Sequence, residues 1–249
     1  MVSKIPNDIF QFSTASALMA GLAHNGPSCG QLPGYGSHGI GTFGRMNGEL
    51  LFLDGKPWQM LPSGKVQPAP PETSLPFVQV TKFIPEFEAR TPRLKKNGLL
   101  DLFEKAGPGA GGKNSFVPFV VKGQFKSLHL RIAGPQQHPD QDLAEVAANA
   151  KKWTLEDVKG TMFGIVSPEW MQGVSIGGVH CHFMTEPEQG KDAEGGHVLD
   201  FETGDEADLQ WSVTGRYHLG FPRDEQWESL DLTADITGLN KAEGSDNDA

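Results

Sequence analysis

The segment GVHCHFM (178–184), followed by GGHVLDF (195–201), is the stretch that decides how the chain folds around a site. Side chains alternate between the faces of a β-strand, so His180 and His182 point the same way, with Cα atoms roughly 6.5–7 Å apart. The turn-rich residues 185–196 let the second strand return beside the first and bring His197 to that face. Three converging neutral imidazoles are typical of a catalytic zinc site with one open position.

Other interpretations of these histidines stay open at the level of the residues. Three unrelated sheet histidines, some of them hydrogen-bonded in a core, would have the same spacing. His180, His182 and Glu186 also fit H-x-H-x₃-E, which resembles the first metal motif of the cupins. That alternative is an iron or manganese oxygenase or isomerase with Glu186 as a ligand. A third possibility is a module that binds a metal or a small ligand without catalysis.

The composition limits the class of partner. The 249 residues carry a formal net charge of −10, from 21 basic and 31 acidic side chains, which argues against nucleic acid and an anionic membrane surface. Cys29 and Cys181 are too far apart in sequence to suggest a disulfide framework, which favours a reducing compartment. Residues 1–10 lack the apolar core of a signal peptide, and no stretch reaches membrane-spanning length. We therefore predict a cytoplasmic protein with no membrane or nucleic-acid partner.

The abundance of turn residues, 31 Gly and 18 Pro, favours a sheet-rich fold. We predict an α+β (α/β two-domain) protein with two mainly antiparallel or mixed β-sheets and few helices. GPGAGGKN (107–114) is the best linker candidate, so we expect an N-terminal mixed-sheet domain over 1–110, carrying Glu49. Residues 111–249 would then form a C-terminal antiparallel-sheet domain whose β-hairpin carries the three-histidine metal site.

Local patterns predict most of the individual elements. Apolar runs on either side of Asp54-Gly55 predict a hairpin over 48–60. The other expected elements are a strand at 9–12, helices at 13–26 and 142–152, a hairpin over 116–132 and an antiparallel pair over 207–221.

Three short motifs suggest other chemistries but stand in the wrong context. GYGSHG (34–39) and GPGAGG (107–112) fit G-x-G-x-x-G, yet neither lies between a strand and a following helix, as a dinucleotide site requires. GVSIG (173–177) fits G-x-S-x-G but runs into a strand, whereas a nucleophile elbow runs into a helix. We therefore expect neither a dinucleotide enzyme nor a serine hydrolase.

Several blocks along the chain together resemble the α-acetolactate decarboxylases. The histidine segments resemble that family's G-x-H-x-H-F followed by G-G-H-V-x-D, and residues 39–59 resemble its N-terminal signature and hairpin. Residues 114–131 are similar to the family segment that ends in an arginine, here Arg131, and AEG (242–244) is similar to its late Glu-Gly. The tract after Arg131, IAGPQQHPDQDLAE (132–145), departs from the family pattern.

The resemblance implies a homodimeric enzyme with one Zn²⁺ per subunit that converts (S)-2-acetolactate, a 2-hydroxy-3-oxo acid, to (R)-acetoin and CO₂. It implies that the metal ligands are His180, His182 and His197. It also implies that the catalytic groups around the open coordination position are Glu49, Arg131 and Glu243, and that Thr42 and Arg131 bind substrate. Without the resemblance, both glutamates would be taken as solvated, and Arg131 as a surface charge at a strand end.

Overall fold

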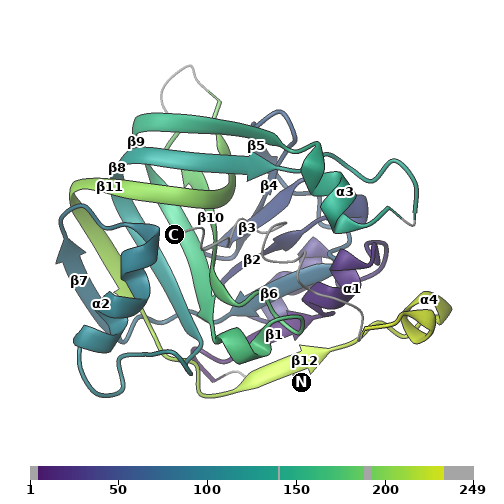
Figure 1. Ribbon diagram of the computed structural model, residues 1–249, viewed down its shortest axis with the longest axis horizontal. Coiled ribbons are helices and arrows are strands. Elements are labelled where there is room, and N and C mark those ends of the chain that lie inside the picture. Colours follow the sequence, from purple (N-terminus) through teal and green to yellow (C-terminus); the bar gives the residue numbers. More distant parts are fainter. Residues whose placement is uncertain (1–4, 140, 188–191, 233–249) are drawn as a thin grey trace.

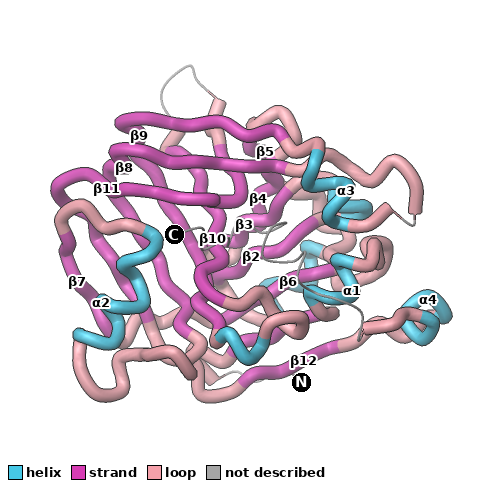
Figure 2. The backbone as a smooth tube through the Cα atoms, in the orientation of Figure 1, coloured by secondary structure: helices cyan, strands magenta, loops and turns pink. Residues whose placement is uncertain are grey.

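Two β-sheets make up most of the molecule, and the short helices lie at their edges and ends, as the computed structural model shows (Figure 1). The structure describes residues 5–139, 141–187 and 192–232. The backbone is dominated by strands and connecting loops (Figure 2). The prediction of two mainly antiparallel or mixed sheets with few helices is confirmed.

The larger sheet is built chiefly from the N-terminal part of the chain. Its strand order is β12-β1-β6-β2-β3-β4-β5, and β1 pairs in parallel with β12 while its other strand pairs are antiparallel. The strands are β1 (Ile9–Phe12), β2 (His38–Thr42), β3 (Glu49–Leu53), β4 (Lys56–Met60), β5 (Val66–Pro68), β6 (Phe77–Thr81) and β12 (Tyr217–Gly220).

The second sheet has the order β10-β9-β8-β11-β7 and is antiparallel throughout. Because β10 also pairs with β11, strands β8 to β11 close into a ring, with His182 opposite His197 at the closing seam. The strands are β7 (Phe87–Thr91), β8 (Val117–Ile132), β9 (Lys151–Ser167), β10 (Gly178–Thr185) and β11 (Gly195–Trp211).

The helices begin at well-defined caps. Thr14 accepts a hydrogen bond from the Ala17 amide at the start of α1 (Ala15–Met19), and Asp142 accepts one from Glu145 at the start of α3 (Leu143–Ala148). These two helices pack against each other. The remaining helical segments are α2 (Leu99–Lys105), α4 (Glu225–Ser229) and the 3₁₀ turns η1 (Cys29–Gly34), η2 (Gly44–Met46), η3 (Lys96–Gly98) and η4 (Glu169–Met171). None of the described helices is both long enough and apolar enough to cross a bilayer.

The core between the sheets positions the site. Ile40 and Leu51 of the larger sheet pack in one apolar cluster with Phe163 and Ile165 of the ring. A separate cluster fills the other side of the ring, and Cys181 is buried there. The histidine face of β10 therefore looks toward β3, between the two sheets, as strand alternation predicts.

Two of the expected hairpins are wrong. Residues Val117–Ile132 form the single strand β8. Gly123 lies within this strand, opposite the place where β11 bulges between Thr203 and Ala207, so the glycine accompanies a bulge and not a turn. Residues 207–221 do not pair with each other, since β11 ends at Trp211 and β12 crosses to β1. Both expected helices exist but are shorter, since α1 ends at Met19 and β9 begins at Lys151.

Each sheet takes one strand from the other part of the chain. Strand β7 joins the sheet of the later strands through β11, and β12 joins the sheet of the earlier strands through β1. The division into domains at residues 110 and 111 stays a prediction.

Candidate metal centre

Three buried histidines converge between the sheets. One ring nitrogen from each of His180, His182 and His197 lies within 4.8 Å of the others, close enough for the three to share one ion. The side chains come from two strands that are paired at this point, since His182 of β10 lies opposite His197 of β11. Glu186, the carboxylate of the cupin-like alternative, is exposed and does not belong to this cluster.

The hydrogen bonding of His182 shows which nitrogen it presents. Its Nδ1 lies 2.7 Å from the carbonyl oxygen of Leu50, which can only accept, so Nδ1 carries the proton and Nε2 carries the lone pair. Nε2 is buried, and it has no hydrogen-bond partner among the described residues. A backbone carbonyl that fixes the tautomer of a ligand histidine is a recurrent feature of metal sites. The donor set therefore fits a divalent metal ion.

Burial keeps the three imidazoles neutral. Desolvation lowers the pKa of His182 to about 4, although its hydrogen bond to Leu50 works in the other direction. Desolvation also holds the pKa of His180 and of His197 well below the ordinary range, and the positive charge of Arg131 adds to the effect. Neutral imidazoles are the form that binds metal, so the cluster is ready to do so near neutral pH.

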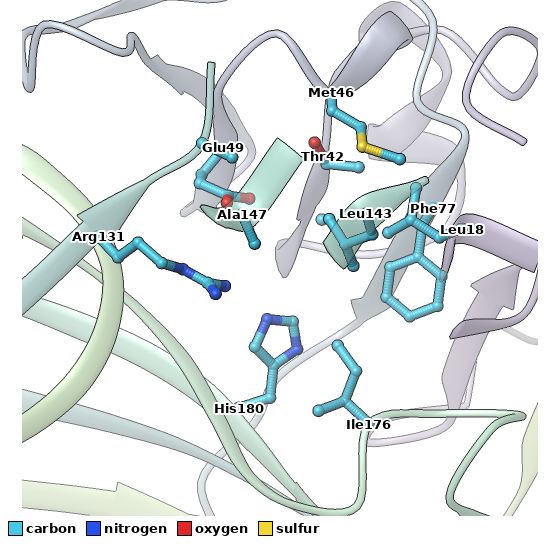
Figure 3. Close-up of a pocket in the computed structure, with 12 residues that line it drawn as sticks. Leu18, Thr42, Met46, Glu49, Phe77, Arg131, Leu143, Ala147, Ile176 and His180 are labelled. Carbon is cyan, nitrogen blue, oxygen red and sulfur yellow. The ribbon is translucent and has the colours of Figure 1, made fainter. Parts of the chain in front are cut away.

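A small cavity opens beside the cluster, and it is lined on one side by polar residues (Figure 3). Glu49, Arg131, Thr42 and His180 all line this cavity, whose volume is about 20 Å³. Arg131 is only 4% exposed and lies on β8 directly opposite His197, so strand register brings its guanidinium to the metal cluster. In Figure 3 the guanidinium points toward the space above the His180 ring.

The turn over residues 43–48, which contains η2, brings Glu49 and Thr42 to this cavity. Glu49 begins β3 and pairs with Thr42 at the end of β2, and a Glu49 carboxylate oxygen lies 3.8 Å from Nε2 of His182. The Thr42 hydroxyl donates to the Gly48 carbonyl at 3.0 Å, which closes the turn. Gly48 has a φ of +91°, and a Cβ there would meet the Met60 carbonyl oxygen at 2.3 Å, so only glycine fits.

The rest of the cavity lining is apolar, and the sequence did not predict it. Its lining comes from α1, η2, β6, the segment before β10 and α3, and consists of Leu18, Met46, Phe77, Leu143, Ala147 and Ile176. The helical spacing of Leu143, Val146 and Ala147 could have indicated a buried helix face, but not what that face covers. Glu243, the remaining predicted site residue, lies outside the described residues.

The chain matches known proteins over nearly its whole length. A family model described as alpha-acetolactate decarboxylase matches residues 9–234. An alpha-acetolactate decarboxylase from Methylococcus capsulatus is 32% identical over 227 residues, which cover 91% of this chain and 84% of the relative. Another from Streptococcus thermophilus is 34% identical over 225 residues, covering 85% of this chain and 90% of the relative.

Solved structures share the fold. The alpha-acetolactate decarboxylase of Bacillus subtilis strain 168 superposes with a TM-score of 0.86 at 24% identity, covering 95% of this chain and 99% of that one. A Staphylococcus aureus protein described as similar to alpha-acetolactate decarboxylase superposes with a TM-score of 0.86 at 26% identity, covering 95% of this chain and 100% of that one.

Proposed function

Because the chain belongs to the alpha-acetolactate decarboxylase family, we propose that it is a carboxy-lyase that converts (S)-2-acetolactate to (R)-acetoin and CO₂. The observation that carries the proposal is the convergence of three neutral histidines beside Arg131 and Glu49 in one cavity. The cupin-like alternative is not supported, because Glu186 is exposed and does not belong to the histidine cluster.

We propose that His180, His182 and His197 hold Zn²⁺. All-nitrogen donors with neutral rings suit this ion, and three protein ligands leave a position open. When bound, the zinc supplies a Lewis acid that draws electron density from the ketone and hydroxyl oxygens of the substrate.

Arg131 is proposed to bind the substrate carboxylate. A guanidinium presents a planar fork of N–H donors that matches a carboxylate. Because Arg131 is nearly buried, water competes little for these donors. The bond between C1 and C2 then breaks, its electron pair moves toward the ketone oxygen to leave an enediolate, and the carboxylate carbon departs as CO₂. Thr42 would line the same substrate space.

Glu49 and Glu243 are proposed to move the protons. Glu49 lies at the cavity beside His182 and would hold the hydroxyl proton during bond cleavage and return it afterwards. Glu243 would deliver a proton to C2 from one face, which sets the configuration of the product. The assignment of Glu243 rests on the family resemblance.

The test is acetoin formation from racemic 2-acetolactate by purified protein, measured by chiral gas chromatography before and after chelator treatment. We expect activity that disappears with the chelator and returns with zinc but not with iron or manganese, and an excess of the R product. Inactivity in protein that retains one zinc per chain would overturn the proposed function. Activity restored equally by iron or manganese would overturn the zinc assignment.

The cytoplasmic location and the homodimer are also proposals. The first is supported by the cysteine usage, and the second by the family resemblance. Light scattering coupled to size-exclusion chromatography tests the dimer, since a mass near 26.9 kDa would mean a monomer.

A further inference from the structure

The cavity beside the histidines has two unlike halves. In Figure 3, Arg131 and Glu49 lie on one side, and Met46, Phe77 and Leu18 lie on the other. We call the apolar part of the lining the alkyl wall, defined as Leu18, Met46, Phe77, Leu143, Ala147 and Ile176. Ala147 is the member of the wall that lies beside Glu49 in Figure 3. A ligand of this cavity must therefore carry its oxygen atoms at one end and hydrocarbon at the other.

The alkyl wall is a packed structure and not a loose rim. Its residues belong to one apolar cluster in which Leu18, Met46, Leu143 and Ile176 are each at least 94% buried. Such a cluster resists a change of volume, because protein interiors are close-packed. The wall therefore offers a pocket of definite size.

A buried glutamine fastens the segments that carry the wall. Gln136 is only 2% exposed. Its side-chain amide donates to the Gly21 carbonyl at 2.9 Å and to the Gln141 carbonyl at 2.8 Å. Its backbone amide donates to the Arg45 carbonyl at 2.8 Å. These bonds tie the chain after α1, the turn before Met46 and the approach to α3 to one another.

The space in front of the wall is small. The cavity has a volume of about 20 Å³, which is room for about one water molecule, so one added carbon matters. Ala147 lines this space with the smallest side chain that has a Cβ. Helix α3, which carries Ala147 and Leu143, begins inside the tract that departs from the family pattern. Leu143 therefore belongs to the tract that departs from the family pattern, whereas Ala147 lies just beyond it.

The substrate's own geometry decides which group meets the wall. C2 of a 2-hydroxy-3-oxo acid bears a hydroxyl, a carboxylate, an acyl carbon and one alkyl group in a tetrahedral arrangement. When the three oxygen-bearing substituents face Arg131, Glu49 and the histidines, the fourth substituent points the opposite way. The cavity lining that remains for this fourth substituent is the alkyl wall.

We propose that the alkyl wall selects the substituent on C2 of the substrate, and that Ala147 and Leu143 set its upper size at a methyl group. This inference rests on the proposed function, and it adds which residues determine specificity. An apolar pocket discriminates one methylene by about 10- to 200-fold in kcat/KM. The homologue with an ethyl group on C2 should therefore be the poorer substrate by at least about tenfold.

The experiment measures the ratio of kcat/KM for the C2-ethyl acid to that for 2-acetolactate, in zinc-loaded protein. Ala147→Val should lower this ratio about tenfold or more, and Leu143→Ala should raise it by a similar factor. Ala144→Val is the matched control, because Ala144 is exposed on the same helix. A third substrate carries its extra carbon on the ketone side and keeps the methyl group on C2. Its kcat/KM relative to that for 2-acetolactate should change far less in both wall variants.

Thermal melting first establishes that each variant is folded, since Leu143→Ala removes buried carbon and Ala147→Val does not. Unchanged ratios in a folded Ala147→Val overturn the inference while leaving decarboxylation intact. An equal effect of Ala144→Val would also overturn it.

Absence of decarboxylation by the wild-type protein would overturn the proposed function. A second readout then decides the inference separately: calorimetric binding of the non-reacting 2,3-dihydroxy acids that carry a methyl or an ethyl group on C2. Preference for the methyl acid that is lost in Leu143→Ala supports the alkyl wall as the selector. Equal binding of the two acids overturns it.

Discussion

At the scale of single residues, one hydrogen bond decides which ring nitrogen of His182 can bind a metal ion. The Leu50 carbonyl accepts a hydrogen bond from the protonated Nδ1, which leaves the Nε2 lone pair directed into the cluster. Leu50 is the residue after Glu49 on β3, so the same strand orients a proposed metal ligand and presents a proposed catalytic carboxylate.

Replacement of His182 should abolish metal binding. His182→Gln removes a proposed ligand, so zinc affinity should fall by more than the roughly 10–100-fold typical of losing an outer-shell partner. Metal content after dialysis against a weak chelator, measured by mass spectrometry, checks this result. His129→Gln is the control, since His129 is exposed on β8. Full zinc retention by His182→Gln would contradict the ligand assignment.

Arg131 should not tolerate lysine. Arg131→Lys keeps the charge but loses the planar fork, so kcat/KM should fall by about 100-fold, or roughly 2.7 kcal/mol of transition-state stabilisation. Steady-state kinetics with zinc content determined in parallel check this. Arg90→Lys on β7, whose side chain is 65% exposed, should leave kcat/KM unchanged. A fully active Arg131→Lys would exclude bidentate binding of the carboxylate.

His38 should make the protein less stable in acid. Burial lowers its pKa below the ordinary value despite the nearby Asp54 carboxylate, 3.4 Å away. Below about pH 6.5 the unfolded chain therefore binds a proton that the folded chain does not, and the free energy of unfolding falls as the pH falls. Urea unfolding at pH 7.5, 6.5 and 5.5 measures how the free energy of unfolding falls with pH. This fall should be shallower in His38→Gln than in the wild-type protein, by at most about 1.4 kcal/mol per pH unit. An unchanged slope would mean that His38 titrates normally.

At the scale of elements, predictions succeed where the signal is local. The β3–β4 hairpin was predicted correctly because Asp54 and Gly55 have φ values of +50° and +77°, which suits the two-residue turn that Asp-Gly favours. The strand β8 was mistaken for a hairpin because the partner of Gly123 is a bulge far away in β11, and no local pattern reports such a partner.

The turn between β3 and β4 offers a test in which backbone strain can be measured without any change in side-chain packing. A Cβ at Gly55 would meet nothing within 4 Å, so Gly55→Ala should destabilise only through the positive φ, by about 1 kcal/mol. For a chain of this size the melting temperature should drop by about 2–4 °C. Gly34→Ala, equally open but without a positive φ, should be neutral or slightly stabilising. Equal effects of the two changes in calorimetry would contradict the strain argument.

At the scale of the whole molecule, the site is a junction between the two sheets. β10 and β11 supply the histidines, β8 supplies Arg131, and β2 and β3 supply Thr42 and Glu49. The histidine spacing could be predicted because it lies within one strand pair. The positions of Glu49 and Arg131 beside it could be predicted only from the resemblance to a family. The alkyl wall could not, since it assembles from separate segments whose packing depends on the completed fold.

Metal binding should stabilise the whole fold. An ion that binds only the folded state adds about 2.7 kcal/mol when its free concentration is 100 times the dissociation constant. Scanning calorimetry should therefore show a melting temperature about 5–11 °C higher with zinc than after chelation. The same addition should not raise the melting temperature of His182→Gln, and an equal rise there would place the zinc elsewhere.

The strand exchange between the two sheets also constrains the order in which the chain can fold during its synthesis. The outer side of β1 is not covered until Tyr217–Gly220 has left the ribosome, and β7 must wait for the far end of β11, where Thr91 pairs with Ala207. Neither sheet is complete while the early residues emerge alone. The nascent chain therefore exposes unpaired strand edges for most of translation, and these edges can pair with other chains until the last strands arrive.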